Sequence, residues 1–335
     1  MENKDIFEKD WEQELPQENE MGEIRRSIRK RNRKLVLISV ILAAAILLVS
    51  VFGIIPALER LYWNADEFSY GHRSDLEAAL YAYTELFNPG YTVSKVSCRY
   101  AGFASYDLEI QLFSRTGQES RSVGGSLSRN RLAVDDFINN RTSAQNGFQR
   151  KRLPFPKPDQ ALTDSVRAQL EELPEYIRVE ASLSFREDIT MEELVAFKEE
   201  YPYLWITWIA IRATEPTTEW TPLCGMSPFN YFSPVFDGMY KDYPYFNPAN
   251  VHDAGQAEQH FKALLRYSAD LAEKGWGIAP YDEWEIYQNA LDYVEENGVR
   301  SYGVVVMASP AYLLEVMDHE LISFVDLTDA WIDVG

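Results

Sequence analysis

The sequence has few of the residues that build metal, redox and nucleophilic sites. Its 335 residues include two cysteines and four histidines: His72, His252, His260 and His319. No two of these histidines show the i, i+4 spacing, with a glutamate between them, of a zinc-peptidase helix. A glycine-rich phosphate loop and the strained serine turn of hydrolases are also absent from the sequence. We therefore expect no catalytic residue, no metal and no cofactor, and we expect most carboxylates to face solvent.

Positive charge is also scarce, and it is unevenly distributed. The chain has 32 Lys and Arg against 52 Asp and Glu, a net charge of -20, which argues against direct nucleic-acid binding because phosphate contacts depend on cations. Residues 1–58 hold nine basic and nine acidic groups, so the whole excess lies after Leu58. Seven cations stand within ten residues, at Arg25, Arg26, Arg29, Lys30, Arg31, Arg33 and Lys34.

An uncharged apolar run of 24 residues, Leu35–Leu58, follows this basic block directly. As a helix it would be about 36 Å long, enough for the ~30 Å hydrocarbon core of a bilayer. The run exceeds the apolar region of about 7 to 15 residues in a signal peptide, which favours an uncleaved anchor. Because cations are held on the cytoplasmic side, residues 1–34 are expected in the cytoplasm and residues 59–335 outside the cell membrane.

The tail before the basic block is acidic and carries one apolar stripe. Residues 1–23 hold nine acids and two lysines, and Phe7, Trp11 and Leu15 follow at i, i+4 and i+8 before Pro16. This spacing predicts one face of a short helix, which is too short to be stable alone in water. Such a segment suits folding onto a partner's groove. The alternative is a solvated tail with accidental spacing.

Residues 59–138 are predicted to form a small α/β module. Ser74 caps a helix that ends at Asn88-Pro89-Gly90, and alternating segments from Tyr91 and Phe103 indicate strands with one solvated face. Residues 139–160 are polar, basic and rich in proline, and are predicted to be a linker to the C-terminal domain at residues 161–335.

The C-terminal domain has the clearest pattern. A strand from Ile177, a helix opened by the Thr190–Glu193 capping box and a buried strand from Leu204 form one βαβ unit. A second unit has a strand from Tyr302, a helix capped by Ser309-Pro310 and a strand from Ile322. The pattern predicts an α+β fold with a ferredoxin-like (βαβ repeated) sheet and a helical insertion, residues 256–274 and 282–296, between the units.

Two further features allow more than one interpretation. A disulfide between Cys98 and Cys224 is chemically allowed outside the cell, and a buried thiol at Cys98 is equally compatible with its strand pattern. The proline-rich segment 227–248 contains eight aromatic residues, which suit either a recognition loop or, as we favour, packing over the sheet. These are Phe229, Tyr231, Phe232, Phe236, Tyr240, Tyr243, Tyr245 and Phe246.

The segments at residues 180–211 and 301–327 resemble the C-terminal domain of the sigma-factor-regulator family, single-pass membrane anti-sigma factors of Gram-positive bacteria. The basic block, the span and the cytoplasmic Trp11 are similar to that family's N-terminal region. The resemblance implies that the cytoplasmic segment holds an extracytoplasmic-function sigma factor, while the outer domain senses an envelope signal or binds a second membrane protein. Residues 1–34 contain no His or Cys, so the zinc-binding anti-sigma fold is excluded.

A second hypothesis comes from the 277 residues that follow Leu58 and from the aromatic segment. In it the chain is a membrane-anchored extracytoplasmic binding or assembly module with no role in transcription, and its first 58 residues serve only as an anchor.

Overall fold

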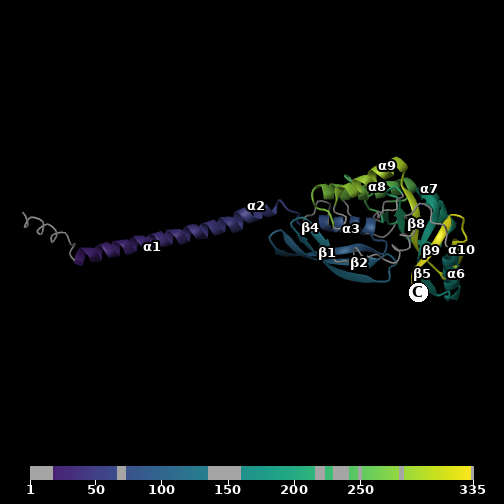
Figure 1. Cartoon of the computed structure of the whole chain (residues 1–335), viewed down its shortest axis with the longest axis horizontal. Helices are drawn as coiled ribbons and strands as arrows, with labels where there is room; N and C mark the ends of the chain where they lie inside the picture. Colours follow the sequence, from purple (N-terminus) through teal and green to yellow (C-terminus); the bar gives the residue numbers. More distant parts are fainter. Residues whose placement is uncertain are drawn as a thin grey trace, which may run out of the picture. The chain divides into compact units, whose positions relative to one another are not determined.

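The structure is a computed structural model that describes residues 18–65, 73–134, 160–215, 223–228, 241–247, 251–278 and 283–332 (Figure 1). The chain divides into two compact units, Met1–Leu61 and Tyr62–Gly335. The mixture of helices and two sheets agrees with the predicted α+β class.

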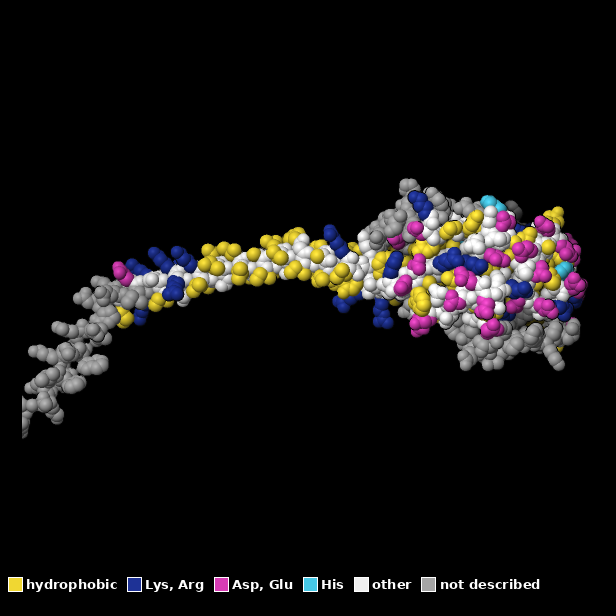
Figure 2. Space-filling model, turned by 90° about the horizontal axis from the view of Figure 1, so that it is seen from above, with side chains coloured by type: hydrophobic (Ala, Val, Ile, Leu, Met, Phe, Trp, Pro, Cys, Tyr) yellow, Lys and Arg dark blue, Asp and Glu magenta, His cyan; other side chains and the backbone are white. Residues whose placement is uncertain are grey.

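The N-terminal unit is a nearly continuous helix. It consists of α1 (Glu18–Val49), a π-helical segment η1 (Ser50–Ile54) and α2 (Ile55–Glu59). Its apolar side chains are exposed on all sides, and the stretch Met21–Glu59 is long and apolar enough to cross a membrane. Figure 2 shows the apolar side chains on every visible side of this helix and the basic side chains at its start. A helix that is apolar all round and unburied by protein is typical of a membrane span.

The second unit, Tyr62–Gly335, is called the outer unit after its predicted place outside the membrane. Its first part pairs a helix with an antiparallel sheet. Helix α3 (Asp75–Phe87) begins where the Ser74 hydroxyl accepts a hydrogen bond from the Glu77 amide, which confirms the predicted cap. The sheet has the order β1 (Tyr91–Gly102), β2 (Ser105–Ser114), β3 (Ser120–Ser128) and β4 (Arg131–Val134). Buried and exposed residues alternate along β2, so one face of the sheet packs on the core and the other is solvated.

The second sheet has the strand order β7-β6-β8-β5-β9, and every described pair in it is antiparallel. Strands β6, β8, β5 and β9 therefore lie in the order that two interleaved strand-helix-strand units produce. The Thr190–Glu193 capping box and the Ser309 cap are both present. The elements are α6 (Gln160–Glu172), β5 (Ile177–Thr190), α7 (Met191–Glu200), β6 (Trp205–Ile211), β7 (Gly225–Met226), β8 (Arg300–Ala308), α10 (Pro310–Met317) and β9 (Ile322–Ile332).

Two helices, α8 (Ala254–Glu273) and α9 (Trp284–Asn297), lie between β7 and β8 in the chain, close to the predicted bounds. Each is followed by a glycine with positive φ, Gly275 and Gly298, which ends the helix. Helix α8 contacts α3, and one continuous core takes residues from both sheets. The predicted linker lies outside the described residues except for Gln160, so the division at residues 139–160 stays a prediction.

Candidate functional site

The residues predicted to set topology and those predicted to bind a partner have different outcomes. The seven cations of Arg25–Lys34 lie on α1 with exposed side chains, in the same helix as the apolar run. Phe7, Trp11 and Leu15 lie outside the described residues, so their role stays a prediction.

The first four residues of the outer unit, Tyr62–Ala65, pack against the rest of that unit. Trp63 is 1% exposed and stacks on Trp276, with ring centroids 5.3 Å apart and ring planes 3° from parallel. The Trp63 amide donates a 2.6 Å hydrogen bond to the Asn130 side-chain oxygen. Trp63, two residues after Leu61, is therefore fixed both by the stacking of its side chain and by the hydrogen bond of its backbone amide.

The neighbours of Trp63 are held as well. The Tyr62 ring meets Phe103 edge-on at 5.7 Å, and the Tyr106 hydroxyl donates to the Asn64 side chain at 3.1 Å. Ala65 is fully buried, and its carbonyl oxygen lies 3.9 Å from the Cys98 sulfur. We call Tyr62, Trp63, Asn64 and Ala65, with the side chains that hold them, the juxtamembrane clasp.

The side chains that hold Tyr62–Ala65 come from two neighbouring turns and from the segment after α8. The β1–β2 turn presents Phe103, and the β3–β4 turn presents Asn130 in the left-handed region, at φ 69°. Asn adopts this region more readily than most residues. The Arg129 amide donates to the Ala104 carbonyl at 2.9 Å, which fixes the two turns side by side. Trp276 follows Gly275, whose positive φ turns the chain at the end of α8.

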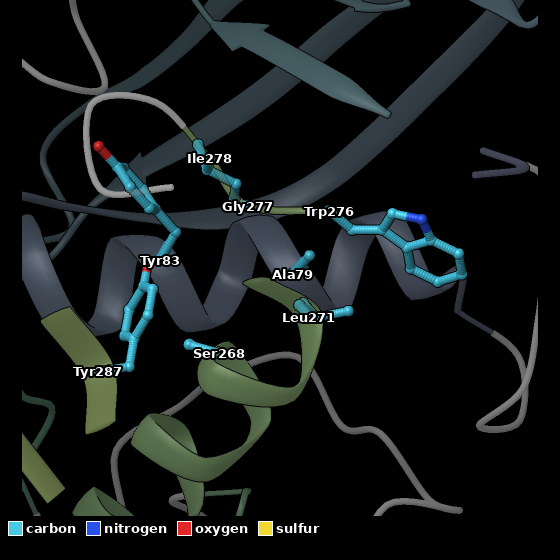
Figure 3. Close-up of a pocket in the computed structure, with 8 residues that line it drawn as sticks. All are labelled: Ala79, Tyr83, Ser268, Leu271, Trp276, Gly277, Ile278 and Tyr287. Carbon is cyan, nitrogen blue, oxygen red and sulfur yellow. The ribbon is translucent and has the colours of Figure 1, made fainter. Parts of the chain in front are cut away.

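A small cavity of about 10 Å³ lies behind Trp276 (Figure 3). Ala79 and Tyr83 reach it from α3, and Ser268 and Leu271 reach it from α8. A space of this size holds about one water molecule and no organic ligand. We therefore do not assign a ligand pocket here, although the cavity shares Trp276 with the clasp. The lining residues are Ala79, Tyr83, Ser268, Leu271, Trp276, Gly277, Ile278 and Tyr287.

A buried ion pair joins the regions of the two sheets. Glu85 on α3 and Arg115, directly after β2, both have fully buried side chains, and the Arg115 guanidinium donates to the Glu85 carboxylate at 3.0 Å. Arg115 also donates to the hydroxyl of Ser227, just after β7, at 2.6 Å. The Ser227 hydroxyl in turn donates to Glu85. From β6, the Trp208 indole donates to the Glu85 backbone carbonyl at 2.9 Å.

Burial and neighbouring groups shift the pKa values of Glu85 and of the nearby His260. Burial alone would raise the pKa of Glu85, but the charge of Arg115 and the hydrogen bond from Ser227 outweigh burial and lower it. Burial lowers the pKa of the nearby His260, whose Nδ1 lies 2.7 Å from the Tyr245 carbonyl oxygen. Its Nε2 is buried without a hydrogen-bond partner among the described residues. Glu85 is therefore ionised and His260 neutral near pH 7, and the network ties α3 to β6 and to the ends of β2 and β7.

The sequence interpretation missed both the clasp and this network. With 84 charged residues in the chain, one Glu and one Arg that are 30 positions apart do not stand out. The available signal was the place of Glu85 in the apolar segment that forms α3, where a carboxylate without a partner would be costly. Trp63 gave a weaker signal, as an aromatic residue directly after a span.

Both cysteines, Cys98 and Cys224, are free in the structure, which agrees with the free-thiol alternative. Cys224 is part of the hydrophobic core, and burial raises the pKa of its thiol to about 12. Cys98 lies on β1, beside the carbonyl of Ala65. Cys98 packs against the same core cluster from its edge.

The aromatic segment is described only in part. Phe229, Tyr231, Phe232, Phe236 and Tyr240 lie outside the described residues. Phe246 is buried against Tyr81 and Tyr267, with ring centroids 5.7 and 5.1 Å away. Tyr243 and Tyr245 pack on the same core, and the Tyr243 hydroxyl donates to Asp270 at 2.5 Å. These contacts are with α3 and α8 rather than with a sheet, and both interpretations of the whole segment stay predictions.

No three His, Cys, Asp or Glu side chains gather as they would around a metal ion within the described ranges. The described residues offer instead a candidate membrane span in the first unit and, in the second, a clasp that holds Tyr62–Ala65 on a continuous core.

Comparison with known proteins finds a match to a protein family. Residues 170–327 match the family described as sigma factor regulator C-terminal, a range that runs from the end of α6 into β9 and includes the helical insertion. No curated protein and no solved structure matches the chain. With one candidate span ahead of this domain, the chain is a single-pass membrane protein. Residues 170–327 are thus similar to the C-terminal domain of sigma factor regulators.

Proposed function

We propose that the chain is a membrane-anchored anti-sigma factor that sequesters an extracytoplasmic-function sigma factor through its cytoplasmic residues 1–34. The observation that carries this proposal is the family domain at residues 170–327, preceded by a single candidate span. In this proposal the outer domain, a ferredoxin-like α+β sheet with a helical insertion, receives an envelope signal or binds a second membrane protein.

The orientation follows from charge. Seven cations precede the apolar run within ten residues, and only Arg60 and Arg73 follow it within the next twenty. Because Lys and Arg are retained on the cytoplasmic side, the tail is inside and the family domain is outside. The anionic inner leaflet adds an attraction of about 1 kcal/mol for each basic residue near its surface.

The acidic tail would bind by ordering on its partner. Phe7, Trp11 and Leu15 share one face of a short helix, and an amphipathic helix in a groove is a recurring mode of peptide recognition. Ordering such a segment costs about 2 to 5 kcal/mol of the interaction energy. A partial loss of the stripe should therefore be enough to release the sigma factor.

Co-purification of the full chain in detergent with each extracytoplasmic-function sigma factor of the same organism tests the proposal. We expect the full chain to retain one of them and Trp11→Ala to weaken that retention about tenfold or more, since interface tryptophans often contribute 2 kcal/mol or more. Gln13→Ala, on the opposite side of the stripe, is the matched control and should retain the sigma factor. If the unaltered chain retains none of them, the proposal fails.

An anchor swap separates this function from that of an outer binding or assembly module. Replacing residues 1–58 with an unrelated single-span anchor of the same orientation should abolish repression of the sigma factor's target genes. If the chimera represses the target genes as well as the unaltered chain does, the assembly module is favoured.

A further inference from the structure

The two turns of the clasp carry two arginines that stand apart from the others of the outer unit. The side chains of Arg129 and Arg131 are exposed, and neither makes a hydrogen bond or ion pair with the described residues. Every other arginine described in Tyr62–Gly335 has such a partner or an electrostatic one. In a chain with 52 acidic residues, two guanidinium groups on either side of Asn130 that have no partner within the described ranges need an explanation.

Aromatic side chains surround the same turns. Tyr100, near the end of β1, is 58% exposed and meets Tyr106 edge-on at 5.8 Å. Phe103 is half-buried against Tyr62, and the Lys274 ammonium lies 5.6 Å from the centroid of the Trp276 ring. Asp107 on β2, an acidic neighbour, is already paired with Arg99 at 2.7 Å. Tyr, Trp and snorkelling cations together are typical of side chains at a membrane interface.

The covalent chain keeps these turns close to the bilayer. Leu58 ends the apolar run, and Trp63, which Asn130 holds at 2.6 Å, follows five residues later. Five residues span at most about 18 Å when fully extended. The headgroup layer is itself roughly 5 to 8 Å deep, and the field of an anionic surface extends about one Debye length, or ~8 Å, beyond it. An arginine on this turn is therefore within range of lipid phosphates.

We propose that the β1–β2 and β3–β4 turns bind anionic phospholipid headgroups of the bilayer that the chain's own span crosses, with Arg129 and Arg131 as the phosphate ligands. A guanidinium binds a phosphate through two parallel hydrogen bonds, which suits arginine better than lysine for this role. Phe103 and Tyr100 enter the headgroup layer beside them. The lipid contact would press the clasp closed, because Asn130, between the two arginines, holds Trp63.

Hydrogen exchange of the full chain in lipid nanodiscs tests the proposal. One disc type contains phosphatidylcholine alone, and the other also contains phosphatidylglycerol. We expect the amides of residues 99–106 and 127–132 to exchange more slowly in the anionic discs, by about fivefold for each arginine engaged. High salt should remove the difference because it screens the attraction. Equal exchange in the two disc types overturns the proposal and requires no altered protein.

Charge reversal provides the second arm. Arg131→Glu and the double variant Arg129→Glu with Arg131→Glu should lose the slowing in anionic discs. Lys198→Glu with Lys241→Glu, which makes the same charge change away from the turns, should keep it. Arg131→Glu is included alone because Arg129 has a φ of 48°, where a substitution could disturb the turn itself. Slowing that survives in both reversal variants contradicts the proposal.

A third arm separates bilayer lipid from free phosphate. Water-soluble glycerol phosphate is added to the phosphatidylcholine discs. Because the bilayer holds its phosphates at high local concentration beside the turns, we expect no slowing at millimolar glycerol phosphate. Slowing equal to that in the anionic discs would replace the lipid with a soluble phosphate ligand and overturn the proposal as stated.

Discussion

The N-terminal helix and the outer unit place the same kinds of side chain in opposite surroundings. Leu47 in α1 is 63% exposed, whereas Leu183 in β5 is 0% exposed. No other part of the described chain covers the apolar side chains of the span, so their burial has to come from lipid. The outer unit buries its own leucines, in segments where apolar residues alternate with polar ones or recur at helical spacing. The comparison teaches that the spacing of apolar residues along a segment, more than their number, indicates whether lipid or protein surrounds it.

The two regions meet within very few residues. Leu61 is 72% exposed, while Trp63 is 1% exposed and stacked on Trp276. The change from a lipid-solvated chain to a protein-packed one is thus complete across two residues. This sharp boundary means that the stability of each region can be perturbed separately.

The largest effect is expected from breaking the buried ion pair of the outer unit. Arg115→Ala leaves the fully buried Glu85 carboxylate without its cation, which should lower the free energy of unfolding by about 3 to 5 kcal/mol. Urea denaturation of the full chain in micelles, followed by tryptophan fluorescence, measures this change. Arg266→Ala, in an exposed pair with Glu295, should cost about 0.2 to 1 kcal/mol. Equal losses in the two variants would show that the Glu85–Arg115 pair is not effectively buried.

A loss of about 3 kcal/mol is expected at the boundary itself. Trp63→Ala removes a buried indole and its stacking on Trp276, and large-to-small changes at such sites cost about 3 to 5 kcal/mol. The lower end applies because the site is close to the end of the unit. Urea denaturation measures this change as well. Trp284→Ala is the control, because the Trp284 side chain is 40% exposed. If Trp63→Ala changes stability no more than the control does, the clasp is open in solution.

The span should respond to charge where the outer unit does not. Ala44→Arg puts a cation near the middle of the apolar run, at an insertion cost of about 2.5 to 3.5 kcal/mol. We expect a smaller fraction of the chain to resist extraction from membranes at high pH, while the outer unit's unfolding midpoint is unchanged. Ala57→Arg, near the end of the run, should be tolerated. Similar extraction of the two variants would argue against a membrane-spanning helix.

A smaller effect is expected at the capping box that opens α7. Thr190→Ala removes the acceptor of the Glu193 amide and should cost about 1 kcal/mol of outer-unit stability. Ser165→Ala, at an exposed position inside α6, serves as the control and should stay within about 0.5 kcal/mol. The comparison is made by urea denaturation, and a cost at Ser165 as large as at Thr190 would contradict the capping interpretation.

The outer unit should also lose stability gradually in acid. Burial lowers the pKa of His260 below its usual 6.5, so the unfolded chain binds a proton there before the folded chain does. The free energy of unfolding should therefore fall as the pH drops below about 6.5. Glu85, with its lowered pKa, adds a loss in the same direction below 4.5. His260→Gln should flatten the upper part of this profile, and an unchanged profile would contradict the assignment.

Much of the fold could be predicted because it follows from local rules. The cap at Ser74, the capping box at Thr190 and the glycines after α8 and α9 are all present in the structure. Both strand-helix-strand units are present as well, since their apolar patterns have clear periods. Strands β3 and β4 were not predicted, because serines and glycines in β3 leave only Val123 and Leu127 buried.

The contacts that connect distant segments could not be predicted from local patterns. Glu85, Arg115 and Ser227 come together only because α3 lies beside both sheets. The sequence around each of these residues does not indicate that the other two are its partners. The stacking of Trp63 on Trp276 depends in the same way on the turn at Gly275. The choice between a disulfide and free thiols at Cys98 and Cys224 stayed open for a related reason, since two cysteines in a sequence do not show where their sulfur atoms point.

The parallel stacking of Trp63 on Trp276 has an optical consequence. Two indoles this close couple their electronic transitions, and transition moments rotated against each other within the parallel planes give a paired positive and negative band in the far-ultraviolet circular dichroism spectrum. Any motion that separates the rings would abolish the couplet while leaving the bands of the helices and sheets in place. The protein thus contains a built-in, label-free reporter of whether the chain leaving the membrane is held or released.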